Sequence, residues 1–221
     1  MIDPYAKAEI KRFNVGRAPQ GLAVSPDGLK VFVHNFMDRS VTVHDVSQLV
    51  QGTGTDVSLV ATYQAVANES LSTQVLLGKQ HFYDAVDLRL ALQAYISCAS
   101  CHNAGGQDGR VWDLGGFGEG VRNTIDLRGR SGMAHGRLHW SANFDEVHDF
   151  EGQIRGLSAG QGLLTNAQFA ATQDPLGSPK AGLSPDLDAL AAYVGSLAET
   201  DESPFRNGDG SLSAAAQAGK T

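Results

Sequence analysis

Two cysteines and one histidine form the most informative pattern in this chain. The run Cys98-Ala99-Ser100-Cys101-His102 holds both cysteines of the 221 residues. Two thiols with two residues between them can add to the two vinyl groups of one porphyrin, and a histidine directly after the second thiol can bind the iron. The pattern therefore predicts one covalent c-type haem, attached through Cys98 and Cys101, with His102 as the proximal iron ligand.

Three other uses of two cysteines stay open. A thioredoxin-like redox pair has the same spacing but does not require the following histidine. A structural zinc site would need two further ligands, and none of the other histidines stands at a zinc-finger spacing. A disulfide across two residues could form in an oxidising compartment. The position of His102 favours haem over these alternatives.

The group on the other side of the iron would decide the chemistry. A histidine or methionine there favours electron transfer, whereas an open position admits a small ligand such as peroxide. His139 stands out because it directly precedes Trp140, which could relay electrons or pack against the haem. His139 is therefore predicted as a sixth ligand or an acid–base group, with Met133 as the weaker alternative ligand. The candidates after His102 are Met133, His135, His139 and His148.

Composition and charge limit the partners and the location. The net charge of −7 argues against nucleic-acid binding, and no apolar run is long enough to span a membrane. Residues 1–20 lack the apolar stretch of a signal peptide, yet covalent haem attachment normally takes place outside the cytoplasm. We therefore expect an excerpt of a longer exported protein, periplasmic or otherwise extracytoplasmic. The expected partners are a second haem domain or an electron-transfer protein, with peroxide as a candidate oxidant.

Residues 1–66 predict a small antiparallel β segment. Pro26-Asp27-Gly28 is typical of a turn, and residues 15–47 resemble one blade of a YVTN-type β-propeller. One blade cannot close a ring, so the rest of a propeller lies upstream or the segment packs against the haem domain. His34 and His44 fall on these strands as structural or solvated residues. The expected strands are Ile10–Val15, Gly21–Ser25, Lys30–His34, Val41–Val46 and Ser58–Val66.

Residues 67–200 predict a helical haem domain with long glycine-rich loops, and residues 201–221 a polar linker or tail. Ser72 can cap a helix over residues 69–97, whose second half from Leu88 would deliver the cysteines. A further helix is expected over Asp145–Leu157, and Ser184-Pro185-Asp186 is a strong helix start. The predicted fold class is therefore mainly α: a cytochrome c-like domain preceded by one propeller-like blade.

Three segments resemble the first haem domain of the di-haem cytochrome c peroxidase/MauG family. They are "LLGKQHFYDAVDLRLALQAYISCASCHNAGGQDGR", "VRNTIDL" and "HWSANFDEVHDFEGQIR", and the resemblance extends over Ser72 to Leu164. The C-terminal "SLSAAAQAGKT" resembles the lead-in to a second haem domain. The resemblance implies a peroxidase-like oxidoreductase that forms part of a larger di-haem protein.

The same resemblance implies roles for five residues. Trp140 matches a tryptophan between the two haems, while His139 and Gln153 match positions that line the distal pocket. Arg122 would pair with haem propionates. Asn123 matches a ligand of calcium, whose other ligands would come from the second domain.

Two departures from the family pattern limit this reading. Gly116-Phe117-Gly118 stands where the peroxidases carry a histidine between two glycines, and Phe117 cannot ligate iron. Gln161 stands near the place of their acid–base glutamate, and an amide cannot shuttle a proton as a carboxylate does. The alternative function is a pure electron-transfer domain without catalysis, its iron held by His102 together with His139 or Met133.

Overall fold

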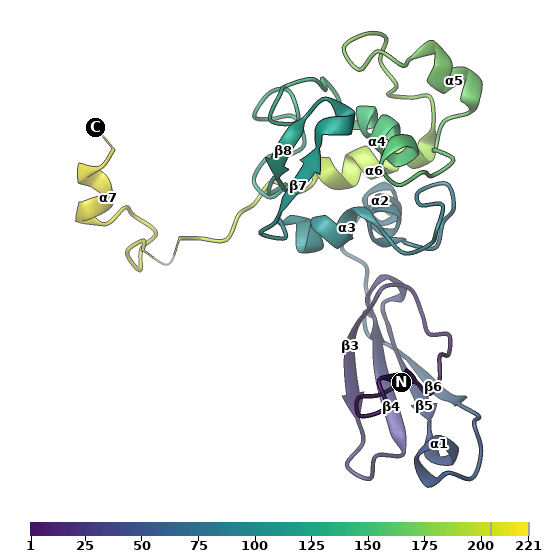
Figure 1. Ribbon diagram of the computed structural model, residues 1–221. Helices are drawn as coiled ribbons and strands as arrows, with labels where there is room; N and C mark the ends of the chain where they lie inside the picture. The colour runs from purple at the N-terminus through teal and green to yellow at the C-terminus, as the bar shows by residue number, and fades with distance from the viewer. Residues whose placement is uncertain (204, 221) are drawn as a thin grey trace.

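The computed structural model describes residues 1–203 and 205–220. Figure 1 shows an antiparallel sheet from the N-terminal part of the chain, a group of helices and loops that follows it, and a C-terminal extension. The extension ends in the short helix α7 (Ala214–Ala218), which lies away from the rest. Pro204 and Thr221, which belong to the predicted tail, lie outside the described residues.

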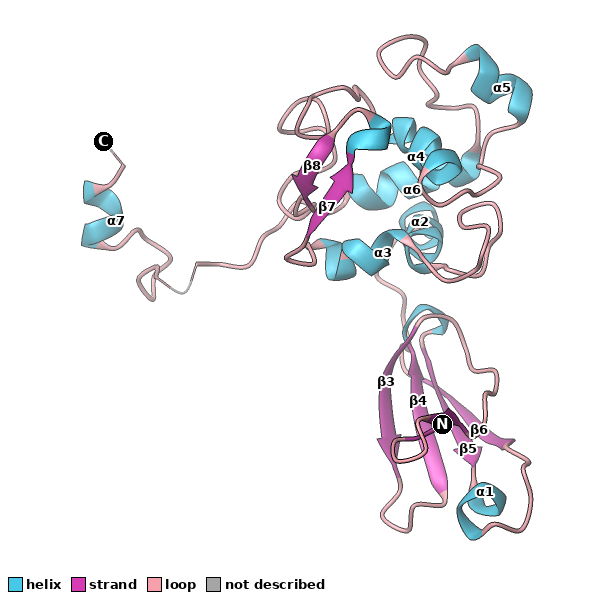
Figure 2. Ribbon diagram, viewed as in Figure 1, coloured by secondary structure: helices cyan, strands magenta, loops and turns pink. Residues whose placement is uncertain are grey.

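Strands contribute more to the fold than the sequence predicts. Within residues 1–203 and 205–220, helices account for 28% and strands for 20%, so the expectation of a mainly α fold is wrong. Figure 2 shows where the helices and strands lie. One reason is that the glycine-rich stretch 103–140 is not all loop. Its run Val-Trp-Asp-Leu forms β7 (Val111–Leu114), which pairs antiparallel with β8 (Gly120–Asn123) around the short 3-10 turn η3 (Gly115–Phe117).

The N-terminal sheet contains four antiparallel strands in sequence order. Alternate residues of a strand face opposite sides, so Val31 and Val33 are buried while Phe32 and His34 are exposed. The expected strand over residues 10–15 does not form, and Val15 packs instead against the buried valines. The strands are β3 (Pro19–Val24), β4 (Lys30–Asn35), β5 (Ser40–Asp45) and β6 (Ser58–Gln64); helix α1 (Ser47–Gln51) precedes β6, and the small pair β1 (Ile2–Asp3) and β2 (Ala8–Glu9) precedes β3.

Two helices form the centre of the second part, α2 (Thr73–Tyr83) and α6 (Pro185–Gly195). Ser72 and Ser184 cap them, each accepting a backbone N–H with its side chain, as the sequence predicts. The two helices approach so closely that a Cβ atom at Gly78 would overlap the carbonyl oxygen of Ala189. Glycine is therefore required at this helix crossing, because no other residue leaves room for the facing backbone.

The corner between β4 and β5 joins the sheet to these helices. The 3-10 turn η1 (Phe36–Asp38) places the Phe36 ring 5.2 Å from the ring of Tyr83 at the end of α2, measured between centroids. Met37 is 2% exposed and belongs to the same apolar cluster as Tyr83. The ammonium of Lys79 lies 4.6 Å from the centre of the Phe36 ring. The sheet is thus packed directly against α2, the helix that precedes the two cysteines.

The expected helix over residues 69–97 ends at Tyr83, and the segment before the cysteines is a loop. The Asp84 carboxylate accepts the backbone N–H of Val86 and of Asp87, and the Asp87 carboxylate accepts that of Arg89. Such local side-chain bonds compete with helical hydrogen bonding. These aspartates therefore explain why the helix stops.

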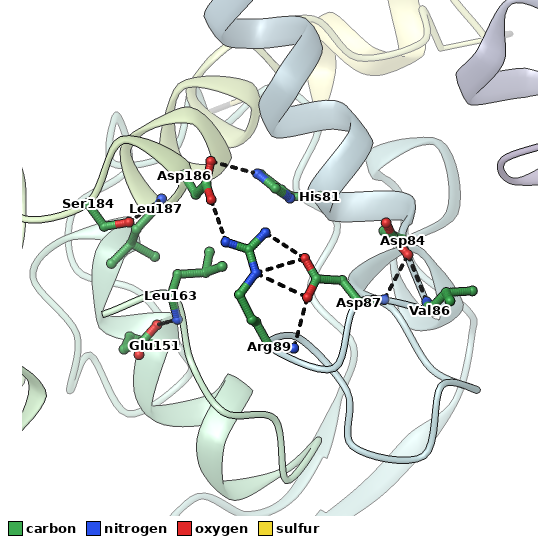
Figure 3. Close-up of polar contacts among 10 residues, drawn as sticks. All are labelled: His81, Asp84, Val86, Asp87, Arg89, Glu151, Leu163, Ser184, Asp186 and Leu187. Atoms are coloured by element: carbon green, nitrogen blue, oxygen red, sulfur yellow. Dashed lines mark hydrogen bonds and ion pairs between the residues drawn. The ribbon is translucent and has the colours of Figure 1, made fainter. Parts of the chain in front are cut away.

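An ion-pair network ties this loop to the start of α6 (Figure 3). Arg89 binds Asp87 through two nitrogens and reaches Asp186 with an Nη1–Oδ2 distance of 2.6 Å. The imidazole of His81, from α2, lies 3.2 Å from the other oxygen of Asp186. The hydrogen bonds from Arg89 hold the pKa of the Asp87 carboxyl below its usual value. The loop that leads to the cysteines is therefore held in place by charge as well as by packing.

The remaining elements surround this centre. The expected helix over residues 145–157 is split, because a 3-10 turn comes before the α-helix. Lys180, 2% exposed, reaches back to Asp149 with an Nζ–Oδ1 distance of 2.6 Å. None of the described helices is long and apolar enough to cross a lipid bilayer. The elements are η4 (Val147–Phe150), α4 (Glu151–Gly156) and α5 (Asn166–Ala171).

Replacing Gly78 by alanine tests the close crossing of α2 and α6. In an open helix this change stabilises by roughly 1 kcal/mol. At Gly78 we expect the opposite sign, a loss of about 1–3 kcal/mol, because the methyl group must displace the facing backbone. Urea unfolding followed by circular dichroism measures the difference. Gly152→Ala in α4 is the matched control, since nothing lies within 4 Å of its added Cβ; stabilisation by both variants would contradict the close crossing.

The network around Arg89 predicts a loss of stability in acid. Burial opposes ionisation of Asp186, but hydrogen bonds from Arg89 and His81 outweigh burial and lower its pKa, as Arg89 lowers the pKa of Asp87. A carboxylate with a lowered pKa in the folded state stabilises above its unfolded pKa of about 3.9, and this contribution is lost as the pH falls through the folded value.

Asp186→Asn should therefore cost about 1–3 kcal/mol at pH 7. The difference in free energy of unfolding between the variant and the natural chain should be smaller at pH 3, because the Asp186 carboxyl of the natural chain is then becoming neutral as well. Urea titrations of both proteins at the two pH values measure it. An equal difference in free energy of unfolding at both pH values would show that the charge of Asp186 contributes nothing to stability.

Candidate haem-attachment site

A single helical turn carries both cysteines. Helix α3 (Cys98–Cys101) has four residues, and the Ser97 N–H donates to the Ser100 hydroxyl at its start. The His102 N–H donates to the carbonyl oxygen of Cys98, which closes the turn. Residues three apart lie on the same side of a helix, so the two thiols face one direction with His102 directly after them.

Two backbone carbonyls contact the His102 ring, those of Gly106 and Ile125. The Nδ1 atom lies 3.1 Å from the carbonyl oxygen of Gly106, and this contact favours the tautomer with the hydrogen on Nδ1 and the lone pair on Nε2. Burial lowers the pKa of His102 and favours the neutral ring. A neutral imidazole oriented through its second nitrogen is the form in which histidine binds metals.

The chain returns to His102 through a tight bend. Gly105 has a φ of 73°, in the left-handed region, and a Cβ added there would lie 2.9 Å from the Leu197 side chain. The Ala104 N–H donates to the Tyr83 hydroxyl at 3.0 Å. The bend is part of η2 (Asn103–Gly105), and it brings the Gly106 carbonyl to the imidazole.

The thiols do not fit a redox pair. Burial raises the pKa of Cys98 to about 11, and burial raises that of Cys101 as well, with Asp108 adding to the effect. A thioredoxin-like pair needs a thiol with a lowered pKa. Both cysteines are free thiols, and no group of three or more His, Cys, Asp and Glu side chains within residues 1–203 and 205–220 is arranged to hold a metal ion. The paired thiols and the oriented imidazole together fit a c-type haem.

His139 lies on a separate, strained loop. Leu138 and Phe144 pair across the loop, and His139 between them has a φ of 62°, which is uncommon outside glycine. The imidazole lies 4.1 Å from the Phe144 ring and 5.1 Å from the Phe150 ring, between centroids. Its Nδ1 is 2.8 Å from the side-chain oxygen of Asn143. The ring is therefore held in one orientation.

The loop before β8 brings a buried carboxylate to His139. Glu119 is 2% exposed, and its Oε1 lies 3.4 Å from His139 Nδ1 and accepts the hydroxyl of Ser141. Its Oε2 is buried without a partner. Glu119 is not among the residues that the sequence predicts; its one sequence signal is that it is a single acid within the glycine-rich run Gly115–Gly120.

Gln153 faces the same region from α4. Phe150, Gln153 and Gly156 follow one another at intervals of three and so share one side of the chain as it enters and forms α4. Phe150 touches His139, and a Cβ at Gly156 would lie 2.9 Å from the Phe117 ring. The Gln153 oxygen Oε1 is buried without a hydrogen-bond partner. Gln153 therefore shares a side of the chain with Phe150, which touches His139, and with Gly156, which lies beside Phe117.

Arg122, Asn123 and Trp140 meet at the surface. The Trp140 indole N–H donates to the backbone oxygen of Asn123 at 3.0 Å, and the ring is 61% exposed. Together with Val121 these residues line a shallow hollow of about 360 Å³. The Arg122 Nε is buried without a partner, while its Nη1 donates to the Val121 carbonyl. An unpaired guanidinium N–H suits an anionic oxygen such as that of a propionate.

The other candidate ligands lie in different settings. Met133 is partly buried in an apolar cluster with Leu138, Phe144 and Val147. His135 is exposed, and His148 lies 3.0 Å from Asp188 and 3.4 Å from Glu146. Among the described residues no hydrogen bond, ion pair or ring contact joins His102 to His139, Gln153 or Met133. No cluster of acidic side chains surrounds Asn123 in this part of the chain, so the described residues alone do not assemble a calcium site.

Comparison with known proteins shows similarity to a curated protein. No family model matches the chain. The gamma subunit of hydrazine synthase from Kuenenia stuttgartiensis is 34% identical over 154 residues, which cover 67% of this chain and 39% of that protein. This chain thus spans about two fifths of the length of the curated relative it matches. A solved chain of hydrazine synthase from the same organism, under xenon pressure, shares 29% identity at a TM-score of 0.43 over 67% of this chain and 43% of that chain; such a score does not establish a common fold.

These findings overturn the expected membership of the di-haem cytochrome c peroxidase/MauG family. The curated relative is named as the gamma subunit of hydrazine synthase, not as a peroxidase or a MauG protein. A haem-attachment run and a few flanking residues are shared requirements of c-type haem domains, and they do not separate one family from another. The roles of Gln153, Arg122, Asn123 and Trp140 therefore rest on the geometry alone.

The raised thiol pKa values predict slow alkylation of the haem-free protein. At pH 7 we expect both cysteines to react with iodoacetamide at least about tenfold more slowly than an ordinary thiol, because so little thiolate is present. The rate should keep rising up to pH 10. Mass spectrometry of trapped protein measures it, and an unfolded peptide of residues 95–105 is the control. A plateau near pH 7 would instead indicate an activated redox thiol.

Proposed function

We propose that this chain is a c-type haem redox segment of a multi-subunit enzyme of the hydrazine synthase kind. One observation carries the proposal: His102 comes directly after two thiols on one helical turn, and its Nδ1 contact with the Gly106 carbonyl favours a lone pair on Nε2, the atom that would bind iron. The similarity to a subunit of hydrazine synthase supports a role within a larger enzyme. Compartments that attach haem covalently lie outside the cytoplasm, and there we place the chain.

The domain division that accompanies this proposal has three parts. Residues 1–66 form a propeller-like blade, residues 67–200 the haem domain, and residues 201–221 a connection to a further redox unit. The first boundary, after residue 66, follows the end of the four-stranded antiparallel sheet. This sheet contacts the helical part through Phe36 and Met37. The extended course of the chain after α6 supports the second (Figure 1).

Different residues would hold different parts of the cofactor. Cys98 and Cys101 would hold the porphyrin as thioethers, and His102 Nε2 would ligate the iron. Arg122 offers its unpaired Nε–H to a propionate. Bound in this way, haem supplies one-electron chemistry and a position for a small ligand.

His139 and Gln153 would be polar groups near the bound ligand in this proposal. His139 lies against Glu119, and two buried oxygens, on Glu119 and on Gln153, have no hydrogen-bond partner among the described residues. Buried polar atoms are rarely left unpaired unless a ligand or water completes them. His139 accepts a proton at Nε2, and Gln153 orients the ligand by hydrogen bonding.

Trp140 is the proposed contact for electron exchange. A tryptophan that is 61% exposed contributes little to the core, and the hydrogen bond to Asn123 fixes its indole in one position. An ordered aromatic ring at the surface suits contact with another redox group. The partner is a second haem domain or an electron-transfer protein within the same enzyme.

Covalent haem is the decisive test. The chain, exported in a host with a cytochrome c maturation system, should keep haem on a denaturing gel and show the mass of one haem. Replacing both cysteines by alanine should abolish the haem signal. His102→Ala should keep haem on the chain but change the absorption spectrum, because the iron loses its protein ligand.

His135→Ala is the matched control, because His135 is exposed and outside the site. It should leave both the haem content and the spectrum unchanged. A colourless natural chain from the same host, alongside a control cytochrome that matures normally, would refute the proposed function.

A further inference from the structure

Glu119 is a buried acid, and it has no part in the proposed binding of the cofactor. A carboxylate away from water is costly unless it is paired or hydrogen bonded. Its described neighbours are the Ser141 hydroxyl, which donates to Oε1, and the His139 ring at 3.4 Å. No lysine or arginine in the described chain forms an ion pair with it.

A second buried acid shows what a purely structural carboxylate looks like here. Glu151 is 0% exposed, and both of its oxygens are used. Oε1 accepts from Arg155 and from the Leu164 N–H, and Oε2 accepts from the Leu163 N–H. Glu119 differs because its Oε2 is buried with no partner at all. The fold therefore does not use up the hydrogen-bonding capacity of Glu119.

The position of Glu119 decides which nitrogen of His139 carries the hydrogen. Two oxygens flank Nδ1, from Asn143 at 2.8 Å and from Glu119 at 3.4 Å. The orientation of an amide is an assignment, since its oxygen and nitrogen can be exchanged. An ionised carboxylate only accepts, so a lone pair on Nδ1 would face a negative oxygen. The two oxygens around Nδ1, from Asn143 and from Glu119 as a carboxylate, therefore favour the tautomer with the hydrogen on Nδ1 and the lone pair on Nε2.

The loop keeps this arrangement rigid. Ser141 lies two residues after His139 in the loop closed by Leu138 and Phe144, and its hydroxyl ties the loop to Glu119. The two phenylalanine rings confine the imidazole. The direction of Nε2 is thus fixed before any ligand arrives.

We propose that Glu119 is a positioning residue that holds His139 as a proton acceptor at Nε2 for a small protic molecule bound at the haem. The inference rests on the proposed function, because the molecule needs iron as its other partner. For an acid HX, the H–X bond breaks, the proton moves to Nε2, and the electron pair left on X forms the bond to ferric iron. Nothing is oxidised or reduced in this step.

Hydrogen cyanide is the probe, because it binds ferric haem with loss of its proton. Carbon monoxide is the comparison ligand, because it binds ferrous haem and has no proton to lose. The holoprotein is compared with Glu119→Gln, His139→Ala and the double variant. Glutamine has nearly the same shape but can donate to Nδ1, which would move the ring hydrogen to Nε2 and remove the acceptor.

We expect Glu119→Gln and His139→Ala each to slow cyanide association by at least about tenfold. Carbon monoxide association should not change. The double variant should be no slower than His139→Ala, because Glu119 acts through that ring. Asp113→Asn, which removes a charge from an exposed position of the same hairpin, is the matched control and should bind cyanide normally.

The outcomes separate the two proposals. A protein with covalent haem whose Glu119→Gln variant binds cyanide at the natural rate overturns the inference and leaves the proposed function standing. A low-spin ferric spectrum that His139→Ala converts to high spin overturns it too, because His139 would then be an iron ligand. Absence of covalent haem refutes the proposed function itself.

A measurement on the natural chain protects the test against a variant that does not fold. Nitrogen-15 NMR of the ferrous carbon monoxide form, which is diamagnetic, distinguishes a protonated from an unprotonated ring nitrogen. We expect His139 to show a protonated Nδ1 and an unprotonated Nε2. The reverse assignment overturns the inference.

Discussion

The hydrogen bond from His102 to the Gly106 carbonyl is the constraint on which the site depends. This bond limits rotation of the imidazole, and it favours the tautomer in which the residue after the second thiol presents a lone pair on Nε2. The bond requires a backbone that turns back within four residues. Gly105 supplies the left-handed turn, and the Tyr83 hydroxyl holds Ala104. One ligand orientation is thus built from a glycine, a tyrosine of α2 and the helix packing beneath it.

The support for this turn comes from parts of the chain that lie far apart in sequence. Tyr83 belongs to the apolar centre between α2 and α6, and it also contacts Phe36 at the corner of the sheet. Gly78 allows α2 and α6 to cross closely. A change at the corner between β4 and β5 would therefore displace the loop of His102 through the Tyr83 side chain, because close-packed interiors transmit displacements.

Local signals in the sequence predicted those parts of the structure that depend on local chemistry. The caps at Ser72 and Ser184 and the turn between β3 and β4 require only neighbouring residues, and they are confirmed. The predicted helix over residues 69–97 extends beyond the observed end at Tyr83. Helical spacing of apolar residues continues past Tyr83, but Asp84 and Asp87 form turns there. The sequence does not predict the hairpin of β7 and β8, because β7 is only four residues long, is mostly exposed and has glycines close to both ends.

The carboxylate beside His139 could not be predicted for a different reason. The proposed role of Glu119 depends on its neighbours in space, and no sequence spacing links Glu119 to Ser141 or His139. Glu119 and Glu151 are both glutamates next to glycine, so composition does not separate them. Only the structure shows that every oxygen of Glu151 is bonded while Oε2 of Glu119 is not. An acid that the fold leaves unsatisfied is available for chemistry, and its contact with an oriented imidazole indicates which chemistry that is.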